Sequence, residues 1–259
     1  MYDLDAIEAG LAQTIFAGKL HFAPVTDSTN NDALVAARAG APHGSVWFAD
    51  EQLAGRGRGG NAWRSDAREG LYVSTLLRLA IPTGRLLLLP LAAGLAAADA
   101  VLSAAGLEID LRWPNDLLIG GKKTGGILVE ANSENGSGFA VVGIGINVHQ
   151  RAFEPGLATP ATSLDLASGR TISRQALLIA LLRTLEREAD ALNDPSAART
   201  IPERIEAAST WVRGRAVEVH GPQACAGITA GLNEHGFLLV ETAGGRVTVQ
   251  TGGIRTRPD

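Results

Sequence analysis

Residues 55–65, GRGRGGNAWRS, combine backbone freedom with fixed positive charge. This stretch holds four glycines, three arginines and one tryptophan in eleven positions. Glycine lets backbone amides approach a ligand, and the planar guanidinium of arginine offers donors that fit phosphate or carboxylate. The stretch therefore predicts a loop that binds an oxyanion.

The spacing of this loop excludes two common phosphate motifs. A dinucleotide-binding loop leads directly into a helix, whereas Trp63, Arg64 and then a predicted strand follow here, and no Gly-Lys-Ser/Thr closes a P-loop. A solvated turn rich in arginine and glycine is the alternative. Trp63 argues against that alternative, because a large apolar ring beside a polar loop favours closure over a bound group.

A second group of chemistry-bearing residues lies in RWPNDLLIGGKKTGGILVE. Proline stiffens the chain before Asn115 and Asp116. A short hairpin follows, and Lys123 comes after it, just before two glycines. A carboxylate and an ammonium are therefore expected to face one small space. Asp116 is compatible with holding magnesium, orienting an incoming amine or capping a turn. Lys123 taken alone is compatible with an ordinary solvated lysine.

Four small polar side chains form a third group. Ser28 and Thr29 stand at a predicted helix start, Gln52 precedes the glycine loop, and Asn147 lies inside an apolar strand. Each also has a purely structural interpretation, as a helix cap, a strand end or a turn partner.

These residues require elements that bring them together. Capping signals and apolar periodicity predict helices over 4–17, from the TDSTN motif to Gly40, over 84–105 and over 173–192. Strands are predicted over 45–52, from 70 after the glycine loop, in short pieces between 108 and 131, and over 138–150. From Trp211 onward, short alternating strands separated by Asn and Gly turns predict a small all-β unit. We therefore expect two domains, 1–208 and 209–259.

Composition bounds the function. A net charge of −4 and a pI near 5.8 argue against a general nucleic-acid binder, which carries a basic surface. One cysteine, Cys225, makes no internal disulfide, and the histidines show no HExxH motif, which favours a reducing compartment without structural zinc. No signal peptide pattern opens the chain, so a cytoplasmic location is expected. Residues 86–106 contain Pro90 and Asp99, which favours a core helix over a membrane span.

In order along the chain, DSTN, EQLAGRGRGG with a following tryptophan, RWPND, GKKTGGILVE, GIGIN and a terminal β unit resemble the biotin protein ligases. The resemblance covers most of the chain. It implies an α+β fold, with a mixed sheet and flanking helices as in class II synthetases, and a small C-terminal SH3-like β-barrel. It also implies a two-step reaction: biotin and Mg-ATP give biotinyl-AMP, and a lysine of a biotin carboxyl carrier protein, part of a biotin-dependent carboxylase, then takes the biotinyl group.

The resemblance assigns roles to residues. Lys123 is implied to contact the biotin carboxylate and the α-phosphate, and Asp116 to orient the acceptor amine or help hold Mg²⁺. Biotin is implied to be bound by Ser28, Thr29, Asn30, Gln52, Gly55, Arg56, Gly57, Arg58, Lys123 and Gly126. The nucleotide is implied to be bound by Arg56, Arg58, Trp63, Asn115, Lys123 and Asn147. Lys123, Arg58 and Asp116 are the expected catalytic residues.

Two departures from the family pattern stand out. The family commonly has arginine where this chain has Asn61 and often a basic residue where it has Gly59. We therefore expect the phosphate affinity to be lower or to be supplied by Arg64, and the retention of biotinyl-AMP is the property that this departure affects. Few residues precede DSTN, so no DNA-binding winged helix and no DNA partner are expected. No membrane partner is expected either, and a homodimer is left open. A lipoate or octanoate ligase of the same fold and a nucleic-acid-binding module are the alternative functions; the lipoate relatives lack the paired-arginine loop in this form.

Overall fold

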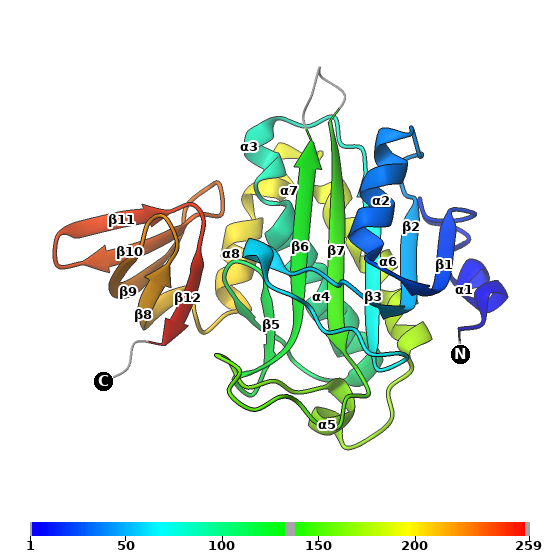
Figure 1. Cartoon of the computed structure of the whole chain (residues 1–259). Coiled ribbons are helices and arrows are strands. Elements are labelled where there is room, and N and C mark those ends of the chain that lie inside the picture. Colours follow the sequence, from blue (N-terminus) through cyan, green and yellow to red (C-terminus); the bar gives the residue numbers. More distant parts are fainter. Residues whose placement is uncertain (1, 133–137, 257–259) are drawn as a thin grey trace.

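A mixed seven-stranded sheet forms the centre of the larger unit. The structure is a computed structural model that describes residues 2–132 and 138–256. The strands are β1 (Leu20–Thr26), β2 (Val46–Gln52), β3 (Gly70–Leu77), β4 (Asp110–Arg112), β5 (Asp116–Ile119), β6 (Lys122–Asn132) and β7 (Phe139–Asn147). Their order is β1-β2-β3-β7-β6-β5-β4, and β1 and β2 run parallel whereas the other neighbours are antiparallel (Figure 1).

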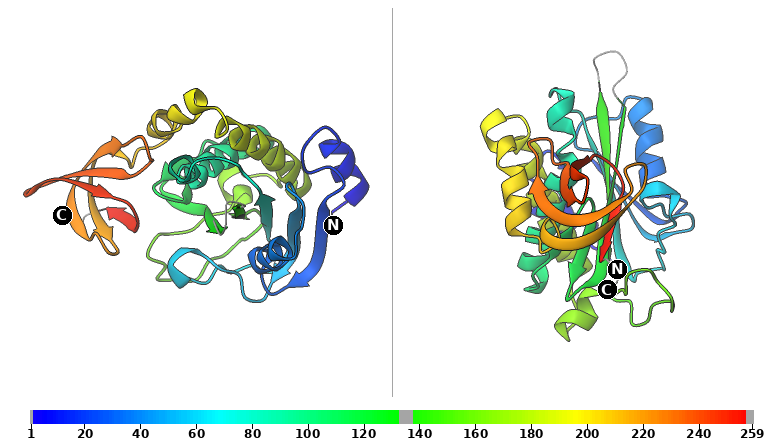
Figure 2. Two further views of the ribbon diagram at one scale, coloured as in Figure 1. Left: turned by 90° about the horizontal axis from the view of Figure 1, so that it is seen from above. Right: turned by 90° about the vertical axis from the view of Figure 1, so that its left-hand side faces the viewer.

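Helices cover both faces of this sheet. The described helices are α1 (Leu4–Leu11), α2 (Thr29–Arg38), α3 (Thr83–Leu86), α4 (Leu89–Ala105), α5 (Leu164–Ser168), α6 (Arg174–Ala191), α7 (Pro195–Arg199) and α8 (Ile201–Ala207), with a 3₁₀ turn, η1, at Arg58–Gly60. Figure 2 shows α4 and α6 on one side of the sheet and α2 on the other. The small side chains of α2, Ala33 and Ala37, pack on Leu76 and Val141 of the sheet. The predicted mixed sheet with flanking helices is confirmed.

The predicted helix over 84–105 is divided into α3 and α4. Pro90 lies in the first turn of α4, where its missing N–H leaves no intrahelical bond unmade, and Gly106 ends the helix in a left-handed conformation with φ 66°. Among the described residues one helical stretch, Thr83–Ala105, is long and apolar enough to cross a membrane, and 61% of its most apolar window is buried within the fold. That burial is typical of a core helix.

The first helix is shorter than predicted. We expected it to reach residue 17, but α1 ends at Leu11. The Thr14 hydroxyl and amide both donate to the Leu11 carbonyl, and the Ile15 amide donates to Glu186 of α6 at 2.7 Å. These contacts replace the helical hydrogen bonds, as β-branched and hydroxyl side chains tend to do.

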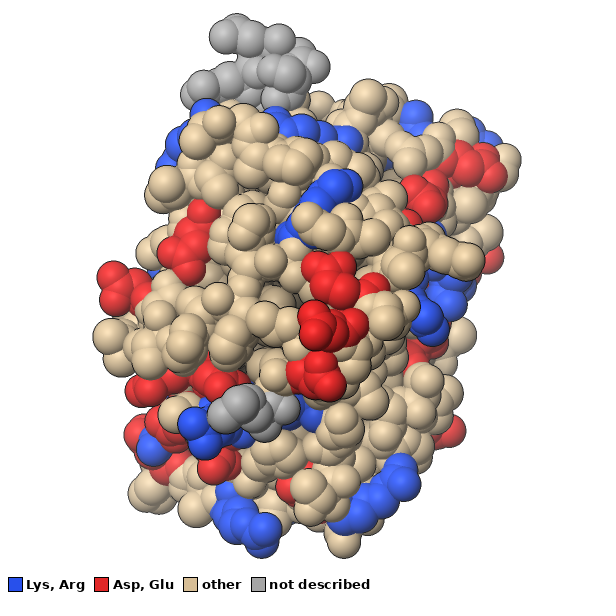
Figure 3. All heavy atoms as spheres, turned by 90° about the vertical axis from the view of Figure 1, so that its right-hand side faces the viewer, with Lys and Arg blue, Asp and Glu red and all other residues tan. Residues whose placement is uncertain are grey.

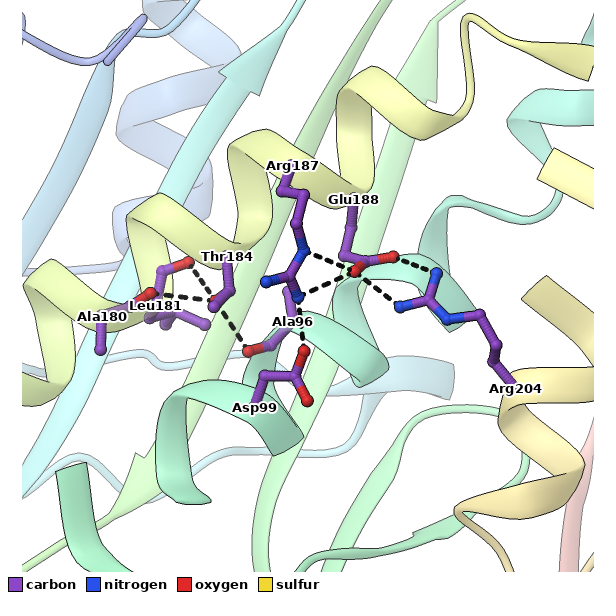
Figure 4. A network of polar contacts seen from close by, with 8 residues as sticks. All are labelled: Ala96, Asp99, Ala180, Leu181, Thr184, Arg187, Glu188 and Arg204. Atoms are coloured by element: carbon purple, nitrogen blue, oxygen red, sulfur yellow. Dashed lines mark hydrogen bonds and ion pairs between the residues drawn. The ribbon is translucent and has the colours of Figure 1, made fainter. Parts of the chain in front are cut away.

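A buried carboxylate fixes α6 against α4 and α8. Glu188, 1% exposed, accepts hydrogen bonds from Arg204 at 2.7 and 2.8 Å and from Arg187 at 3.0 and 3.2 Å (Figure 4). Arg187 also bonds Asp99 of α4, and Thr184 donates to the Ala96 carbonyl at 2.8 Å. Burial raises the pKa of Glu188, but the arginine hydrogen bonds and charges outweigh burial, and the pKa falls below its ordinary value.

The C-terminal unit is a five-stranded antiparallel sheet. Its strands are β8 (Arg213–His220), β9 (Cys225–Leu232), β10 (Leu238–Thr242), β11 (Gly245–Val249) and β12 (Gly253–Thr256), in the order β11-β10-β9-β8-β12. The outer strands β11 and β12 are not paired with each other in the described sheet, so the expected barrel is open along this seam. The small all-β unit itself is confirmed.

The two units share one continuous apolar core. Leu238, Val240 and Ile254 of the C-terminal sheet belong to the same cluster as the buried residues of α4. The Trp113 indole N–H donates to the Gly236 carbonyl at 3.0 Å across the junction. The division into domains 1–208 and 209–259 stays a prediction, with α8 and β8 on either side of the boundary.

The charges on the face that carries α1 and β1 are mixed. Figure 3 shows lysine and arginine side chains scattered between acidic ones on this face, with a short column of acidic side chains near its centre. This face therefore lacks the wide basic field that phosphate backbones bind.

Candidate functional site

A cavity of about 1260 Å³ lies between the central sheet, the glycine loop and the C-terminal unit. Every predicted site residue lines it: Ser28, Thr29, Asn30, Gln52, Gly55, Arg56, Gly57, Arg58, Trp63, Asn115, Asp116, Lys123, Gly126 and Asn147. Residues from distant parts of the chain thus meet in one space. The ligand and metal roles assigned to them stay predictions.

The glycine loop is held by its own backbone. The Trp63 amide donates to the Gly55 carbonyl at 2.9 Å, and a Cβ at position 55 would lie 2.4 Å from the Trp63 carbonyl oxygen. Gly59 and Gly60 have φ of 68° and 80°, which other residues adopt only with strain. The side-chain Nδ2 of Asn61 donates to the Arg58 carbonyl at 2.7 Å. The two loop positions that depart from the family pattern therefore close the turn: the Asn61 side chain bridges it, and Gly59 supplies one of its two left-handed residues.

A polar cluster of four residues, Thr29, Asn30, Gln52 and Ser74, lies at one end of the cavity. The amide and hydroxyl of Thr29 both contact Gln52 Oε1, at 2.9 and 3.1 Å, and the Thr29 hydroxyl lies 2.8 Å from that of Ser74. Ser74 in turn donates to Asn30 Oδ1 at 2.5 Å. Thr29 has one hydroxyl hydrogen, which can be donated to Ser74 or to Gln52 but not to both. One acceptor oxygen of the cluster is therefore free to accept a hydrogen bond from a ligand.

Ser28 stands at the N-cap of α2, but its side chain makes no capping hydrogen bond. Its hydroxyl is therefore available to the cavity. Ser74 is a functional candidate that sequence reasoning missed; in the sequence it is one of two adjacent hydroxyl residues, with Thr75, in the strand GLYVSTLL.

The cluster extends to the glycine loop through Glu130 of β6. Asn30 Nδ2 donates to Glu130 Oε2 at 2.9 Å, and Arg56 contacts both carboxylate oxygens of Glu130, at 3.1 and 2.5 Å. Glu130 was also missed from the sequence, where it is one acidic residue at a strand end.

Asp116 and Lys123 face each other, as their spacing predicts. Lys123 Nζ lies 2.5 Å from Asp116 Oδ1, and Arg112 Nη2 lies 2.6 Å from Asp116 Oδ2. Both carboxylate oxygens are thus occupied by cations. The described residues contain no group of three or more His, Cys, Asp or Glu side chains that could hold a metal ion. Asp116 thereby fixes the direction of the Lys123 ammonium, and its expected role toward Mg²⁺ stays a prediction.

Trp63 lies across the glycine floor of strands β6 and β7. A Cβ at Gly145 would lie 2.6 Å from its Nε1, and one at Gly126 would lie 3.6 Å from its ring. The ring centroid is 5.6 Å from Lys123 Nζ, a cation–π contact. Trp63 Nε1 is buried without a hydrogen-bond partner. An indole N–H in that state is suited to donate to a group that enters the cavity.

Two predicted ligand amides have internal partners. Asn115 Nδ2 donates to the Ile127 carbonyl at 2.8 Å, and Asn147 Nδ2 donates to the Thr162 carbonyl at 3.1 Å. Asn147 thus bonds the segment that leads into α5, and in both residues the side-chain oxygen is the group left for a ligand.

Arg58 reaches the C-terminal unit. Its guanidinium donates to the Thr251 hydroxyl at 2.6 Å and to the Gly252 carbonyl. Burial lowers the pKa of Arg58, and the charge of Asp116 partly offsets this shift. Arg64, the alternative phosphate ligand, instead pairs with Asp66 at 2.7 Å and Glu154 at 3.2 Å at the surface.

Comparison with known proteins shows the family of this chain. The model of the biotin/lipoate A/B protein ligase family matches residues 22–147. The biotin--[acetyl-CoA-carboxylase] ligase of Mycobacterium tuberculosis is 34% identical over 234 residues, which cover 88% of this chain and 85% of that protein. The chain belongs to the biotin protein ligase family.

Other members of the ligase family extend the comparison. The bifunctional ligase/repressor BirA of Bacillus spizizenii is 39% identical over 184 residues, which cover 70% of this chain; the match spans 57% of the BirA chain. The biotin protein ligase from Aquifex aeolicus in complex with biotin and ATP superposes with a TM-score of 0.80 at 30% identity, over 93% of this chain and 100% of that chain. The predicted fold class is confirmed by this likeness.

Proposed function

We propose that the chain is an ATP-dependent biotin protein ligase. The observation that carries the proposal is the meeting of the polar cluster, Lys123 and the arginine loop in one cavity of a member of this family. The ureido ring of biotin offers N–H donors and a carbonyl acceptor, which match a cluster of hydroxyl and amide groups. The Aquifex neighbour, which shares the fold over nearly the whole chain, is a complex with both biotin and ATP.

The first step joins two anions. The biotin carboxylate oxygen attacks the α-phosphorus of ATP, pyrophosphate leaves, and biotinyl-AMP forms. Lys123 lies on the cavity wall near Asp116, and Arg56 and Arg58 lie in the loop that borders the same cavity. These cations reduce the repulsion between the reactants and stabilise the charge that builds on the phosphoryl oxygens.

Asp116 supports this step through Lys123. Its ion pair with the lysine at 2.5 Å fixes the ammonium, while Arg112 balances its second oxygen. We infer that any Mg²⁺ enters on the phosphates of ATP and that Asp116 does not supply its site.

In the second step a lysine ε-amine of a carrier protein attacks the acyl carbon of biotinyl-AMP. An amide forms, AMP leaves and one proton is released. The Mycobacterium tuberculosis relative is a ligase for acetyl-CoA carboxylase, which favours a biotin carboxyl carrier protein of that enzyme as the acceptor. We place this reaction in the cytoplasm, and we propose no DNA or membrane partner.

Mass spectrometry of a purified carrier domain tests the proposal. The domain is incubated with this protein, ATP and magnesium, together with biotin or with lipoate. We expect the mass of one biotinyl group, only with biotin and only with ATP. Addition of a lipoyl group instead would assign the chain to the lipoate branch, and no addition with a competent carrier would refute the ligase function.

A further inference from the structure

One polar path joins the two ends of the glycine loop to the polar cluster. At the C-terminal end of the loop, Gln52 Nε2 donates to the Ser65 hydroxyl at 2.8 Å. At the N-terminal end, Arg56 is paired with Glu130, which also accepts from Asn30. Gln52 and Asn30 both belong to the cluster, so the loop is fastened to it at both ends.

We propose that Glu130 is a positioning residue that couples occupancy of the polar cluster to the order of the glycine loop. The proposal rests on the proposed function, because it takes biotin as the group that enters the cluster. The resemblance to the family assigns no role to Glu130. Its carboxylate contacts both Arg56 of the loop and the side-chain amide of Asn30 in the cluster.

The geometry of Arg56 favours positioning over competition. Its two contacts with Glu130 use one donor on each terminal nitrogen, and arginine has further N–H donors in the same plane. Arg56 can therefore hold Glu130 and an entering anion at once. A loop with glycines at positive φ has many alternative conformations, and a bidentate pair removes some of that freedom before the ligand arrives.

Asn30 connects the polar cluster to Glu130, so the position of Glu130 depends on the state of the cluster. A Cβ on Gly143 would lie 2.0 Å from Asn30 Oδ1, so the Asn30 side chain packs directly on strand β7. Its oxygen accepts from Ser74 while its nitrogen donates to Glu130. A ligand that fixes the cluster hydroxyls thereby fixes the amide that holds Glu130 in place.

Limited trypsin digestion of the whole protein, with and without biotin, tests the coupling. Trypsin cuts after arginine, so the bonds after Arg56 and Arg58 report loop order without any catalytic turnover. In Glu130→Gln without biotin, we expect cleavage to be about fivefold faster than in the wild type, which corresponds to the loss of one partly exposed ion pair. We also expect biotin to protect the loop of this variant less than it protects the wild-type loop. We expect the KM for biotin to rise by a similar factor, with a smaller change in kcat.

Glu154→Gln is the matched control, because it removes a carboxylate that pairs with Arg64 beside the same loop but does not touch the polar cluster. Its cleavage after Arg56 and Arg58, and its protection by biotin, should match the wild type. In an Arg56→Gln background, Glu130→Gln should add nothing to cleavage after Arg58.

Wild-type protection in Glu130→Gln, at an unchanged melting temperature, would overturn the coupling and leave the ligase function standing. Absence of biotin binding and protection in the wild type would instead refute the proposed function itself. A fall in melting temperature that accounts for the faster cleavage of every site in the chain would assign Glu130 a purely structural role.

Discussion

At the scale of single residues, the site is organised by charges that are paired before any substrate enters. Lys123 and Arg112 share Asp116, Arg56 holds Glu130, and Arg58 bonds the C-terminal unit. Each cation therefore has a fixed direction, which lowers the reorganisation needed when two anions meet.

Lys123→Ala should abolish most of the first step while the protein stays folded. Loss of one preorganised cation near the reacting phosphoryl group typically lowers the rate by about 100- to 1000-fold. The measurement is pyrophosphate release with biotin and ATP, together with the melting temperature. Lys122→Ala is the matched control, because this neighbouring lysine is exposed and lies outside the cavity lining. A Lys123→Ala protein with wild-type pyrophosphate release would contradict the role.

At the scale of elements, glycines in β7 leave room for side chains that arrive from elsewhere. Gly143 accommodates Asn30 from α2, and Gly145 accommodates Trp63 from the glycine loop. Strand β7 thus has a floor without side chains at the two points where the site is assembled.

Gly143→Ala should lower biotin affinity by displacing Asn30 from the polar cluster. The added Cβ would lie 2.0 Å from Asn30 Oδ1, so the amide must move and break its bonds to Ser74 and Glu130. We expect at least tenfold weaker biotin binding by calorimetry, the cost of about one charge-assisted hydrogen bond. Gly94→Ala is the control. Gly94 lies within α4, its added Cβ would lie 3.6 Å from Leu111, and alanine is more stable than glycine inside a helix by about 0.5–1 kcal/mol. Equal binding by both variants would contradict the account.

Glu188→Gln should lower the free energy of unfolding at pH 7 by about 1–3 kcal/mol, because it weakens charged hydrogen bonds that tie α6 to α8. The folded pKa of Glu188 lies below its ordinary value of 4.5, so this stabilisation is present above pH 4.5 and is lost as the pH falls through the folded value. Denaturant titrations from pH 7 into the acid range should therefore show the two proteins converging. Glu203→Gln, exposed on α8, is the control. A difference that grew with acid would refute the sign.

The sequence predicted the elements better than it predicted their contacts. Glycine, proline and apolar periodicity located β2, the glycine loop, β7 and α6, because these signals are local. Ser74 and Glu130 were missed because their importance depends on the order β3-β7-β6, which no local pattern encodes. The shortened α1 has the same cause, since its end depends on Glu186 of α6. The predicted site residues, in contrast, were chosen from the order of the motifs along the chain, and all of them line one cavity.

At the scale of the whole molecule, the C-terminal unit forms part of the cavity wall. Thr251, Gly252 and Ile254 line the cavity, and the first two bond Arg58 from a point 193 and 194 residues away in the chain. The glycine loop is therefore bordered by both units, and under the proposed function we expect the junction between them to affect the retention of biotinyl-AMP.

Thr251→Val should speed the release of biotinyl-AMP about threefold, because it removes one hydrogen bond to Arg58 and keeps the side-chain shape. The measurement is the rate at which preformed labelled biotinyl-AMP leaves the protein. In an Arg58→Gln background the substitution should have no further effect. Thr248→Val, exposed on the neighbouring strand β11, is the control. Equal release from the Thr251 and Thr248 variants would show that the contact does not retain the intermediate.

The second partner of Arg58 in the C-terminal unit is the main-chain oxygen of Gly252, a residue with φ 133° at which an added Cβ would lie 2.2 Å from the His220 carbonyl oxygen. Substitution of Gly252 itself therefore displaces that acceptor through the backbone, whereas substitution of the neighbouring side chains leaves it chemically intact, so a scan for loss of labelling fidelity is expected to single out this glycine. Exchanging the entire C-terminal module for one with a longer or shorter turn moves the oxygen, so hybrid enzymes assembled from two relatives should differ in fidelity according to turn length.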